Sequence, residues 1–308
     1  MATLSERLDS GEVIILDGPM GTELQRRGVP MNGTAWSATA MLTHPNVIQE
    51  IHEDYVRAGA DVITINTFSC SRFVLAEAGF GTMTEDFLET AIEMAQEARE
   101  AAAGDRDVFI AGSLSTFFPK GDRRNAPHPA QARAHYQEQA QQMVGLGVEL
   151  LVLEMMQDVE YAGYAIEAAA ETGLPVWVGF SCKVQDGTVM LLEGAPGSSF
   201  AGDLPSLMAH GGDALGVMHT EVADTAPALQ VVLDNWSGAL AAYPNSGDLW
   251  RPNGQLEKII SPTDFLTHAQ QWVQMGVQIV GACCGMGPEH IAALRGNLPT
   301  HIEGRRGG

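Results

Sequence analysis

The sequence has few basic residues and no long apolar run. Only 17 of its 308 residues are lysine or arginine, against 38 aspartate and glutamate residues, so its formal net charge is -21. A chain this acidic repels phosphate backbones and anionic bilayers, so we expect no nucleic-acid or membrane partner. No segment approaches the ~18 consecutive apolar residues that span a bilayer, and residues 1–12 lack the basic start and apolar core of a signal peptide. We therefore expect a cytoplasmic protein.

Cysteine is also scarce, with four residues in the chain: Cys70, Cys182, Cys283 and Cys284. A reducing cytoplasm keeps such thiols unpaired, which favours metal binding or chemistry over disulfides. Of the four, Cys70 and Cys182 are expected to be structural. Hydrophobic residues make up 45% and charged residues 18% of the chain, as in ordinary globular proteins. The composition leaves the oligomeric state open, a homo-oligomer included.

Apolar runs of strand length alternate with amphipathic stretches of helix length. In the first half, strands are expected at 13–18, 61–68, 107–115 and 149–156, and helices at 46–59, 84–103, 129–147 and 158–172. In the second half, strands are expected at 175–182, 213–220, 239–247 and 277–285, each followed by a helical pattern. A glycine suited to a left-handed helix cap precedes five of the strands, namely Gly59, Gly147, Gly173, Gly211 and Gly276.

Eight repeated strand–helix units predict an α/β protein with a single-domain (β/α)8 TIM barrel, because parallel strands with right-handed crossovers close most simply in this way. An open doubly wound sheet is the alternative, but the turn after the first strand, DGPMGTE, lacks the GxGxxG pattern. No low-complexity linker divides the chain, so the barrel is expected over residues 1–299. The polar segment 300–308 contains Ile-Glu-Gly-Arg, which looks like an engineered protease site, and we expect it outside the fold.

Polar residues at the carboxyl ends of the strands mark the expected site, because the reacting groups of such barrels gather there. The strand ends carry Asp17, Asn66, Thr67, Glu154, His219 to Glu221, Cys283 and Cys284. All of them are expected to face one mouth of the barrel.

The adjacent Cys283 and Cys284 are the strongest chemical signal. Regular strand geometry points neighbouring side chains apart, but the flanking Gly281 and Gly285 allow the backbone to depart from it. Two thiolates with the imidazole of His219 form a ligand set that suits Zn²⁺ and leaves a fourth position for substrate. The alternative is that the cysteines are small buried residues and His219 is a hydrogen-bonded packing residue.

Four segments, in order, resemble the homocysteine S-methyltransferase family: DGPMGTELQRRG (17–28), AGADVITINTF (58–68), YPNSG (243–247) and GACCG (281–285). The similarity extends from about residue 11 to about residue 299. It implies a standalone zinc-dependent barrel enzyme, similar to those that use betaine or S-methylmethionine. Such an enzyme moves a methyl group from a sulfonium or quaternary ammonium donor to a homocysteine-like thiol, giving methionine.

The resemblance also implies a ligand set. The family holds zinc with a cysteine after strand six and a cysteine pair after strand eight, and Cys283 and Cys284 match that pair. Residues 216–219 read GVMH, so His219 replaces the first cysteine. Imidazole is a normal zinc ligand, but the exchange changes the formal charge of the zinc site from minus one to zero, which makes a bound thiolate less electron-rich. Glu221 is the weaker candidate for the third ligand.

Substrate roles follow from the same resemblance. Asp17 and Glu154 would hold the amino group of the acceptor, and Gly18 would let the acceptor approach the backbone. Trp36 lies where the family places an aromatic near the donor, whose positive charge an indole face attracts. The alternatives are a cap or an arginine ion pair for the carboxylates, a tight turn for Gly18 and plain packing for Trp36. Asn66 either positions substrate or closes the strand end.

The loop after strand three, AGSLSTFFPKG (111–121), lacks the Gly-Pro-aromatic-Gly pattern common in the family. We expect it to shape the donor pocket, so the donor stays unassigned. Two other functions remain compatible with the sequence. One is a metal-dependent hydrolase or lyase with His219, Glu221 and zinc activating water, although the cysteine pair argues against it. The other is a non-catalytic barrel that binds a methylated osmolyte.

Overall fold

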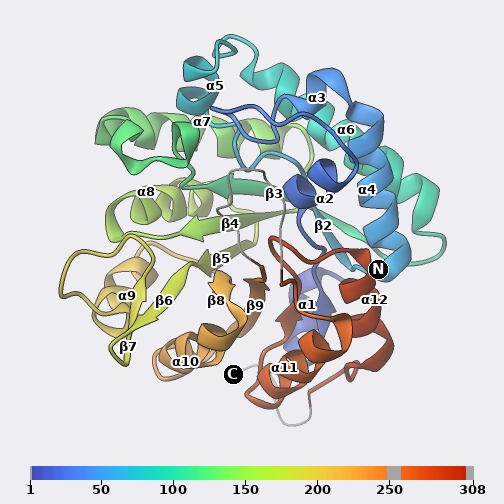
Figure 1. Ribbon diagram of the computed structural model, residues 1–308, viewed down its shortest axis with the longest axis vertical. Helices are drawn as coiled ribbons and strands as arrows, with labels where there is room; N and C mark the ends of the chain where they lie inside the picture. Colours follow the sequence, from blue (N-terminus) through green and yellow to red (C-terminus); the bar gives the residue numbers. More distant parts are fainter. Residues whose placement is uncertain (1, 248–257, 303–308) are drawn as a thin grey trace.

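Eight parallel strands form the centre of the molecule, and helices surround them (Figure 1). The computed structural model describes residues 2–247 and 258–302. Hydrogen bonds join the strands in the order β1-β10-β9-β8-β5-β4-β3-β2, and a parallel bridge between Leu16 and Val62 connects the two ends of this sheet. The predicted TIM barrel is therefore confirmed. In chain order the strands are β1 (Ile14–Ile15), β2 (Val62–Thr64), β3 (Phe109–Ser115), β4 (Leu150–Met156), β5 (Val176–Phe180), β8 (Ala214–Glu221), β9 (Ala239–Asn245) and β10 (Ile279–Val280).

The helices lie close to their expected bounds. The four predicted by residue range are α4 (Pro45–Ala58), α6 (Thr84–Ala102), α7 (Pro129–Gly145) and α8 (Val159–Ala170), and the second half adds α9 (Phe200–Met208), α10 (Val222–Leu233), α11 (Pro262–Gln274) and α12 (Pro288–Asn297). Shorter helices α2 (Met20–Arg26), α3 (Ala40–Thr43) and α5 (Arg72–Glu77) lie in the loops after the first two strands. All five predicted cap glycines have positive φ, between 77° and 127°. The glycine signal therefore located these helix ends correctly.

Helix α4 shows why an outer helix forms. It begins at Pro45, whose fixed φ suits the first helical position. Its side chains at Ile48, Ile51 and Tyr55 recur every three to four residues and are fully buried against the barrel. The helix ends where Gly59 adopts a φ of 108°. The apolar stripe and the cap together fix the length and the facing of the helix.

The inside of the barrel is filled by a separate apolar cluster that includes Val152, Trp177 and Tyr243. The N-terminal helix α1 (Leu4–Asp9) inserts Leu4 into this cluster, where it packs with Ile14 and other residues near the strand starts. The amino end of the barrel is thereby covered. The carboxyl end, where the sequence places the site, is the end left for binding.

One element was missed by the sequence analysis. The strand expected at 175–182 ends at Phe180, and a two-stranded antiparallel hairpin follows before α9. The hairpin consists of β6 (Cys182–Gln185) and β7 (Thr188–Leu191), joined by Asp186 and Gly187 with φ of 50° and 76°. Positive φ at both central residues defines a type I′ turn, which matches the twist of paired strands.

The described part of the C-terminal segment, residues 300–302, lies against residues 11–13, which directly precede β1. The amide of Val13 donates to the carbonyl of Thr300 at 2.8 Å, and the amide of Ile302 donates to that of Gly11 at 2.8 Å. The rest of the Ile-Glu-Gly-Arg stretch lies outside the described residues. None of the helices in the described ranges has the length and apolarity that a bilayer crossing requires.

Packing between β8 and β9 leads to a stability prediction. A methyl group at Gly216 would lie 2.2 Å from the carbonyl oxygen of Ala241 and 2.5 Å from its Cβ. Gly216→Ala is therefore expected to lower the free energy of unfolding by ~2 kcal/mol, as overpacking does. Gly145→Ala, at the end of α7 with no atom near the added methyl, serves as the control and should not lower it. Equal thermal denaturation curves for the two variants would contradict the close contact.

Candidate metal and substrate site

A cavity of about 590 Å³ lies at the carboxyl ends of the barrel strands. Eight of the site residues singled out from the sequence line it, namely Asp17, Gly18, Trp36, Asn66, Glu154, His219, Cys283 and Cys284. Thr67 and Glu221, which also end strands, do not line it. Thr67 is buried and donates to the carbonyl of Ser113 at 2.8 Å, whereas Glu221 is exposed and accepts from Asn245 at 2.8 Å. The structure gives Glu221 no place among the candidate ligands.

The two cysteines follow β10 rather than lying within it, so the strand expected at 277–285 is shorter than predicted. The glycines on either side of the cysteine pair, Gly281 and Gly285, explain why the backbone leaves the strand here. A Cβ at Gly281 would lie 2.8 Å from the Cβ of Leu16, and one at Gly285 would lie 1.8 Å from the carbonyl oxygen of Ser246. Gly285 also has a φ of 91°, which favours glycine. The backbone therefore leaves strand geometry and turns both thiols toward the cavity.

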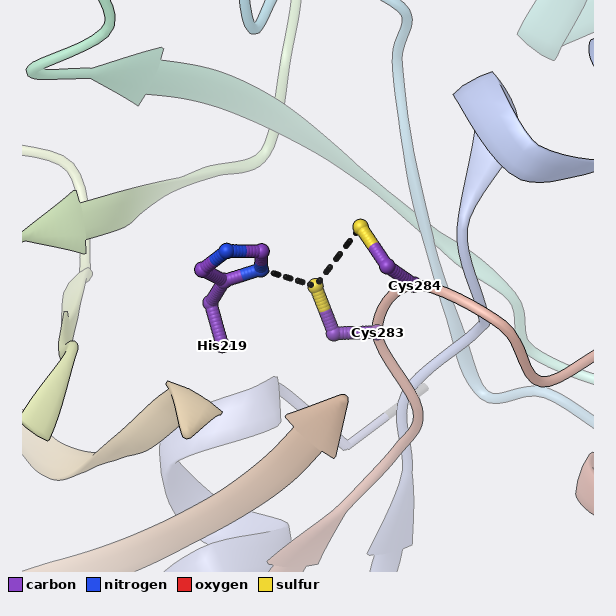
Figure 2. Close-up of side chains that lie close together, drawn as sticks. All are labelled: His219, Cys283 and Cys284. Carbon is purple, nitrogen blue, oxygen red and sulfur yellow. Dashed lines mark hydrogen bonds between the residues drawn. The ribbon is translucent and has the colours of Figure 1, made fainter. Parts of the chain in front are cut away.

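The thiols and the imidazole converge, as Figure 2 shows. The Sγ of Cys283 lies 3.6 Å from Nδ1 of His219 and 3.8 Å from the Sγ of Cys284. One potential ligand atom from each residue lies within 4.8 Å of the other two. In the described ranges, this is the one group of three or more His, Cys, Asp or Glu side chains with the spacing of a metal site. His219 comes from β8, so two strand ends build the cluster.

Three residues of the cavity wall other than glycine have a left-handed backbone. The φ angles of Trp36, Met155 and His219 are 47°, 55° and 43°. Such conformations cost of order 1–3 kcal/mol each and persist where the surrounding structure fixes them, often at functional sites. Here the positive φ angles turn these three side chains in directions that regular strand geometry does not allow. The amino-acid sequence carries no signal for them.

The charge state of these three side chains favours the binding of a cation. The thiol of Cys283 donates a hydrogen bond to Cys284, which with the nearby His219 holds the pKa of Cys284 well below its usual range. The same hydrogen bond, together with burial, raises the pKa of Cys283. Burial lowers the pKa of His219, but bonding to Cys284 and the nearby negative charges outweigh it, so the net shift is upward. Protons therefore occupy the positions that a metal cation would take over.

Two carboxylates line the cavity without a lysine or arginine partner among the described residues: Asp17, which is buried, and Glu154, which is half-buried. Asp17 accepts from the amide of Thr64 at 2.7 Å and from its hydroxyl at 3.1 Å, and Glu154 accepts from the hydroxyl of Ser113. Burial raises the pKa of Asp17 well above its usual range and that of Glu154 to about 7. No lysine or arginine of the described residues pairs with either carboxylate, which removes the ion-pair alternative. Buried carboxylates in this state favour a cationic ligand.

Asn66 holds the loop that carries Trp36. Its side-chain amide donates to the carbonyl of Ser37 at 3.1 Å, and the hydroxyl of Ser37 donates back to its oxygen at 2.7 Å. Gly21 leaves room for the indole, because a Cβ there would lie 2.3 Å from Nε1 of Trp36. The contacts of Asn66 therefore support the structural alternative for this residue, and they place the indole in the cavity wall.

The sequence analysis missed part of the lining. Phe68 lies beside Phe117 with ring centroids 5.3 Å apart, and both rings line the cavity with Trp36. Phe117 belongs to the loop after strand three, so this loop lines the cavity. The same loop leads to Arg123, which also lines the cavity and binds Asp158 at 2.6 Å. Tyr243, within the quoted YPNSG segment, also lines the cavity.

The fold and this site define a (β/α)8-barrel enzyme with a thiol–imidazole cluster and unpaired carboxylates in one cavity. The sequence profile of the homocysteine S-methyltransferase family matches residues 14–298. The chain therefore belongs to that family, and it is a methyltransferase.

Individual relatives are similar in sequence to this chain over most of their own length. A homocysteine S-methyltransferase of Escherichia coli is 27% identical over 94% of this chain and 96% of its own. Betaine–homocysteine S-methyltransferase 1 of Mus musculus is 26% identical over 97% of this chain and 77% of its own. The crystal structure of the metallated form of the homocysteine methyltransferase MmuM from Escherichia coli matches with a TM-score of 0.76 at 25% identity, covering 94% of this chain and 97% of that one.

The cluster geometry predicts how metal content responds to substitution. Cys283→Ser and His219→Ala each remove a ligand, so both purified variants are expected to lose bound metal when the wild type holds about one ion per chain. Cys182→Ala, at a buried cysteine outside the cavity, is the control and should retain it. Elemental analysis by plasma emission measures all four proteins. Full metal content in His219→Ala would remove the histidine from the site.

Proposed function

We propose that this chain transfers a methyl group from a sulfonium or quaternary ammonium donor to the thiol of homocysteine, giving methionine, with Zn²⁺ as its cofactor. The observation that carries the proposal is the meeting of Cys283, Cys284 and His219 in the same cavity as two carboxylates, Asp17 and Glu154, that have no lysine or arginine partner among the described residues. The first group suits a metal, and the second suits an ammonium group.

The donor set fits zinc. A tetrahedral Zn²⁺ ion with bonds of about 2.3 Å to sulfur and about 2.0 Å to nitrogen separates two sulfurs by about 3.8 Å, and a sulfur from a nitrogen by about 3.5 Å. The corresponding separations here are 3.8 Å between the two Sγ atoms and 3.6 Å from Cys283 Sγ to His219 Nδ1. Three protein ligands leave one position free. Zinc, when bound, supplies an acceptor thiol in its thiolate form at neutral pH.

The acceptor binds through its ammonium group. Asp17 and Glu154 present carboxylate oxygens on the cavity side, and each is already oriented by one neighbour, Thr64 or Ser113. A bound ammonium keeps both groups ionised despite their burial. Fixing the amino acid in this way orients its thiol toward the cysteine cluster, so that the two reacting molecules need little further ordering.

The donor binds over aromatic faces. Trp36, Phe68 and Phe117 line the part of the cavity that the loops after the first three strands form. A ring face attracts a cation by roughly 0.5–2 kcal/mol when water is excluded, and the donor carries its positive charge on the atom next to the methyl group. Transfer forms a carbon–sulfur bond to the acceptor and breaks the donor's bond to that carbon. The donor leaves as a neutral thioether or amine.

The two other functions fit the site less well. A hydrolase would need a hard third ligand and a base beside the metal, but Glu221 lies outside the cavity and is bound by Asn245. A non-catalytic barrel would have no use for two thiols at ligand distance. The cavity therefore favours methyl transfer.

A donor panel tests the proposal. The zinc-loaded protein is incubated with homocysteine and, separately, S-methylmethionine, S-adenosylmethionine or glycine betaine, and methionine is measured by mass spectrometry. Methionine should form with at least one of these donors, and Cys283→Ser should form none. Glu167→Gln, which removes the charge of a half-buried carboxylate that pairs with Arg133 and does not line the cavity, is the control and should match the wild type. If no donor yields methionine with a zinc-loaded protein, the proposal is wrong.

Substitution of Glu154 separates acceptor binding from donor binding. Glu154→Gln keeps the shape of the side chain and removes its charge, so the KM for homocysteine should rise about tenfold or more. The KM for the donor should change little, because the carboxylate contacts only the acceptor. Steady-state kinetics with each substrate varied in turn measure both. Equal increases in the two KM values would contradict the assigned role.

A further inference from the structure

The hydroxyl of Tyr243 is a buried polar group without a partner. Its side chain is 4% exposed, and its oxygen has no hydrogen-bond partner in the part of the chain that the structure describes. Leaving such a group unsatisfied costs about 1–3 kcal/mol. Tyr243 lies on β9 and its side chain lines the cavity, so a partner for this oxygen would come from the cavity side.

The position of the hydroxyl indicates which part of a ligand it meets. A Cβ at Gly179 would lie only 2.1 Å from the Tyr243 oxygen, so the ring reaches from β9 across β8 to β5. The register between β4 and β5 passes from Leu153–Val178 to Met156–Phe180. Gly179 therefore lies beside the irregular residues 154–155 of β4. This register brings the hydroxyl to the side of the barrel that carries Glu154.

The charges around the hydroxyl agree with this position. Burial raises the pKa of Tyr243, and the nearby charges of Glu154, Cys283 and Asp17 raise it further. The hydroxyl thus stays protonated and neutral between acidic groups. An ammonium ion carries three N–H donors, and Asp17 and Glu154 supply acceptors for two of them. The remaining donor needs an acceptor on the same side of the cavity.

We propose that the Tyr243 oxygen is the third acceptor for the ammonium group of the thiol substrate, and that it selects α-amino thiols over thiols without an amino group. The inference rests on the proposed function. Three acceptors surround the ammonium, while the hydroxyl proton is free to donate to a carboxylate oxygen. Gly179 serves this arrangement, because any larger side chain would displace the hydroxyl.

The test compares two thiols that differ only in the amino group. Homocysteine and 4-mercaptobutanoate are titrated into zinc-loaded wild type and Tyr243→Phe without donor, by calorimetry. Tyr243→Phe should weaken homocysteine binding about 10- to 100-fold, the effect of losing a hydrogen bond to a charged group, and leave 4-mercaptobutanoate binding unchanged. In steady state, the KM for homocysteine should rise more than kcat falls.

Tyr136→Phe is the matched control. The Tyr136 hydroxyl is also buried and has no partner in the described part of the chain, but it does not line the cavity, so its loss should leave both affinities unchanged. Equal weakening of both thiols by Tyr243→Phe, or no weakening of either, would overturn the inference while leaving the proposed function intact. Wild-type protein that binds neither thiol would overturn both. Zinc content and the thermal denaturation curve show that each variant is folded and loaded.

Discussion

The convergence of two neighbouring thiols on one imidazole depends on the backbone leaving strand geometry at two strand ends. After β10 the departure is fixed by Gly281 and Gly285, where any side chain would collide with Leu16 or with the backbone of Ser246. At the end of β8 the departure is carried by His219 itself, whose φ of 43° is unusual for a residue with a side chain. Regular strands would have directed one thiol outward. The ligand cluster is therefore a product of the barrel's tight strand-end packing.

Charge is the second constraint on the cavity. Asp17, Glu154 and the two thiols bring four acidic groups together, and burial makes their ionisation depend on cations that arrive from outside. The family's first zinc-ligand cysteine is replaced here by His219, so the cavity holds one acidic group fewer than it would with that cysteine. In the proposed zinc site the imidazole would also make the sulfur of a bound acceptor less electron-rich, so that catalysis would rely more on a reactive donor and on exact orientation of both substrates. The carboxylates and the aromatic wall would supply that orientation.

The sequence predicted the barrel because its signals are local. Apolar runs, helix periodicity and the five cap glycines each depend on a few neighbouring residues, and strand ends in a barrel share one face. The hairpin at 182–191 had a local signal too, since Asp186-Gly187 is typical of a type I′ turn, but the preceding apolar run obscured it. Tyr243 stood in a quoted motif without being considered as a site residue. Its importance comes from Gly179 and Glu154, which lie on other strands and become its neighbours only in the closed barrel.

The aromatic part of the cavity, where we propose that the donor binds, could not be predicted in the same way, because loops joined by tertiary contacts build it. Asn66 fixes the loop of Trp36 through Ser37, and Arg123 fixes the loop of Phe117 through Asp158. Asp158 in turn caps α8 by accepting from the amide of Tyr161 at 2.9 Å. The aromatic wall is thus anchored to the ends of β2 and β4, the strands on either side of β3. A change in either anchor would move an aromatic face without altering Cys283, Cys284 or His219, so under the proposed function donor choice and acceptor activation would vary independently on this barrel.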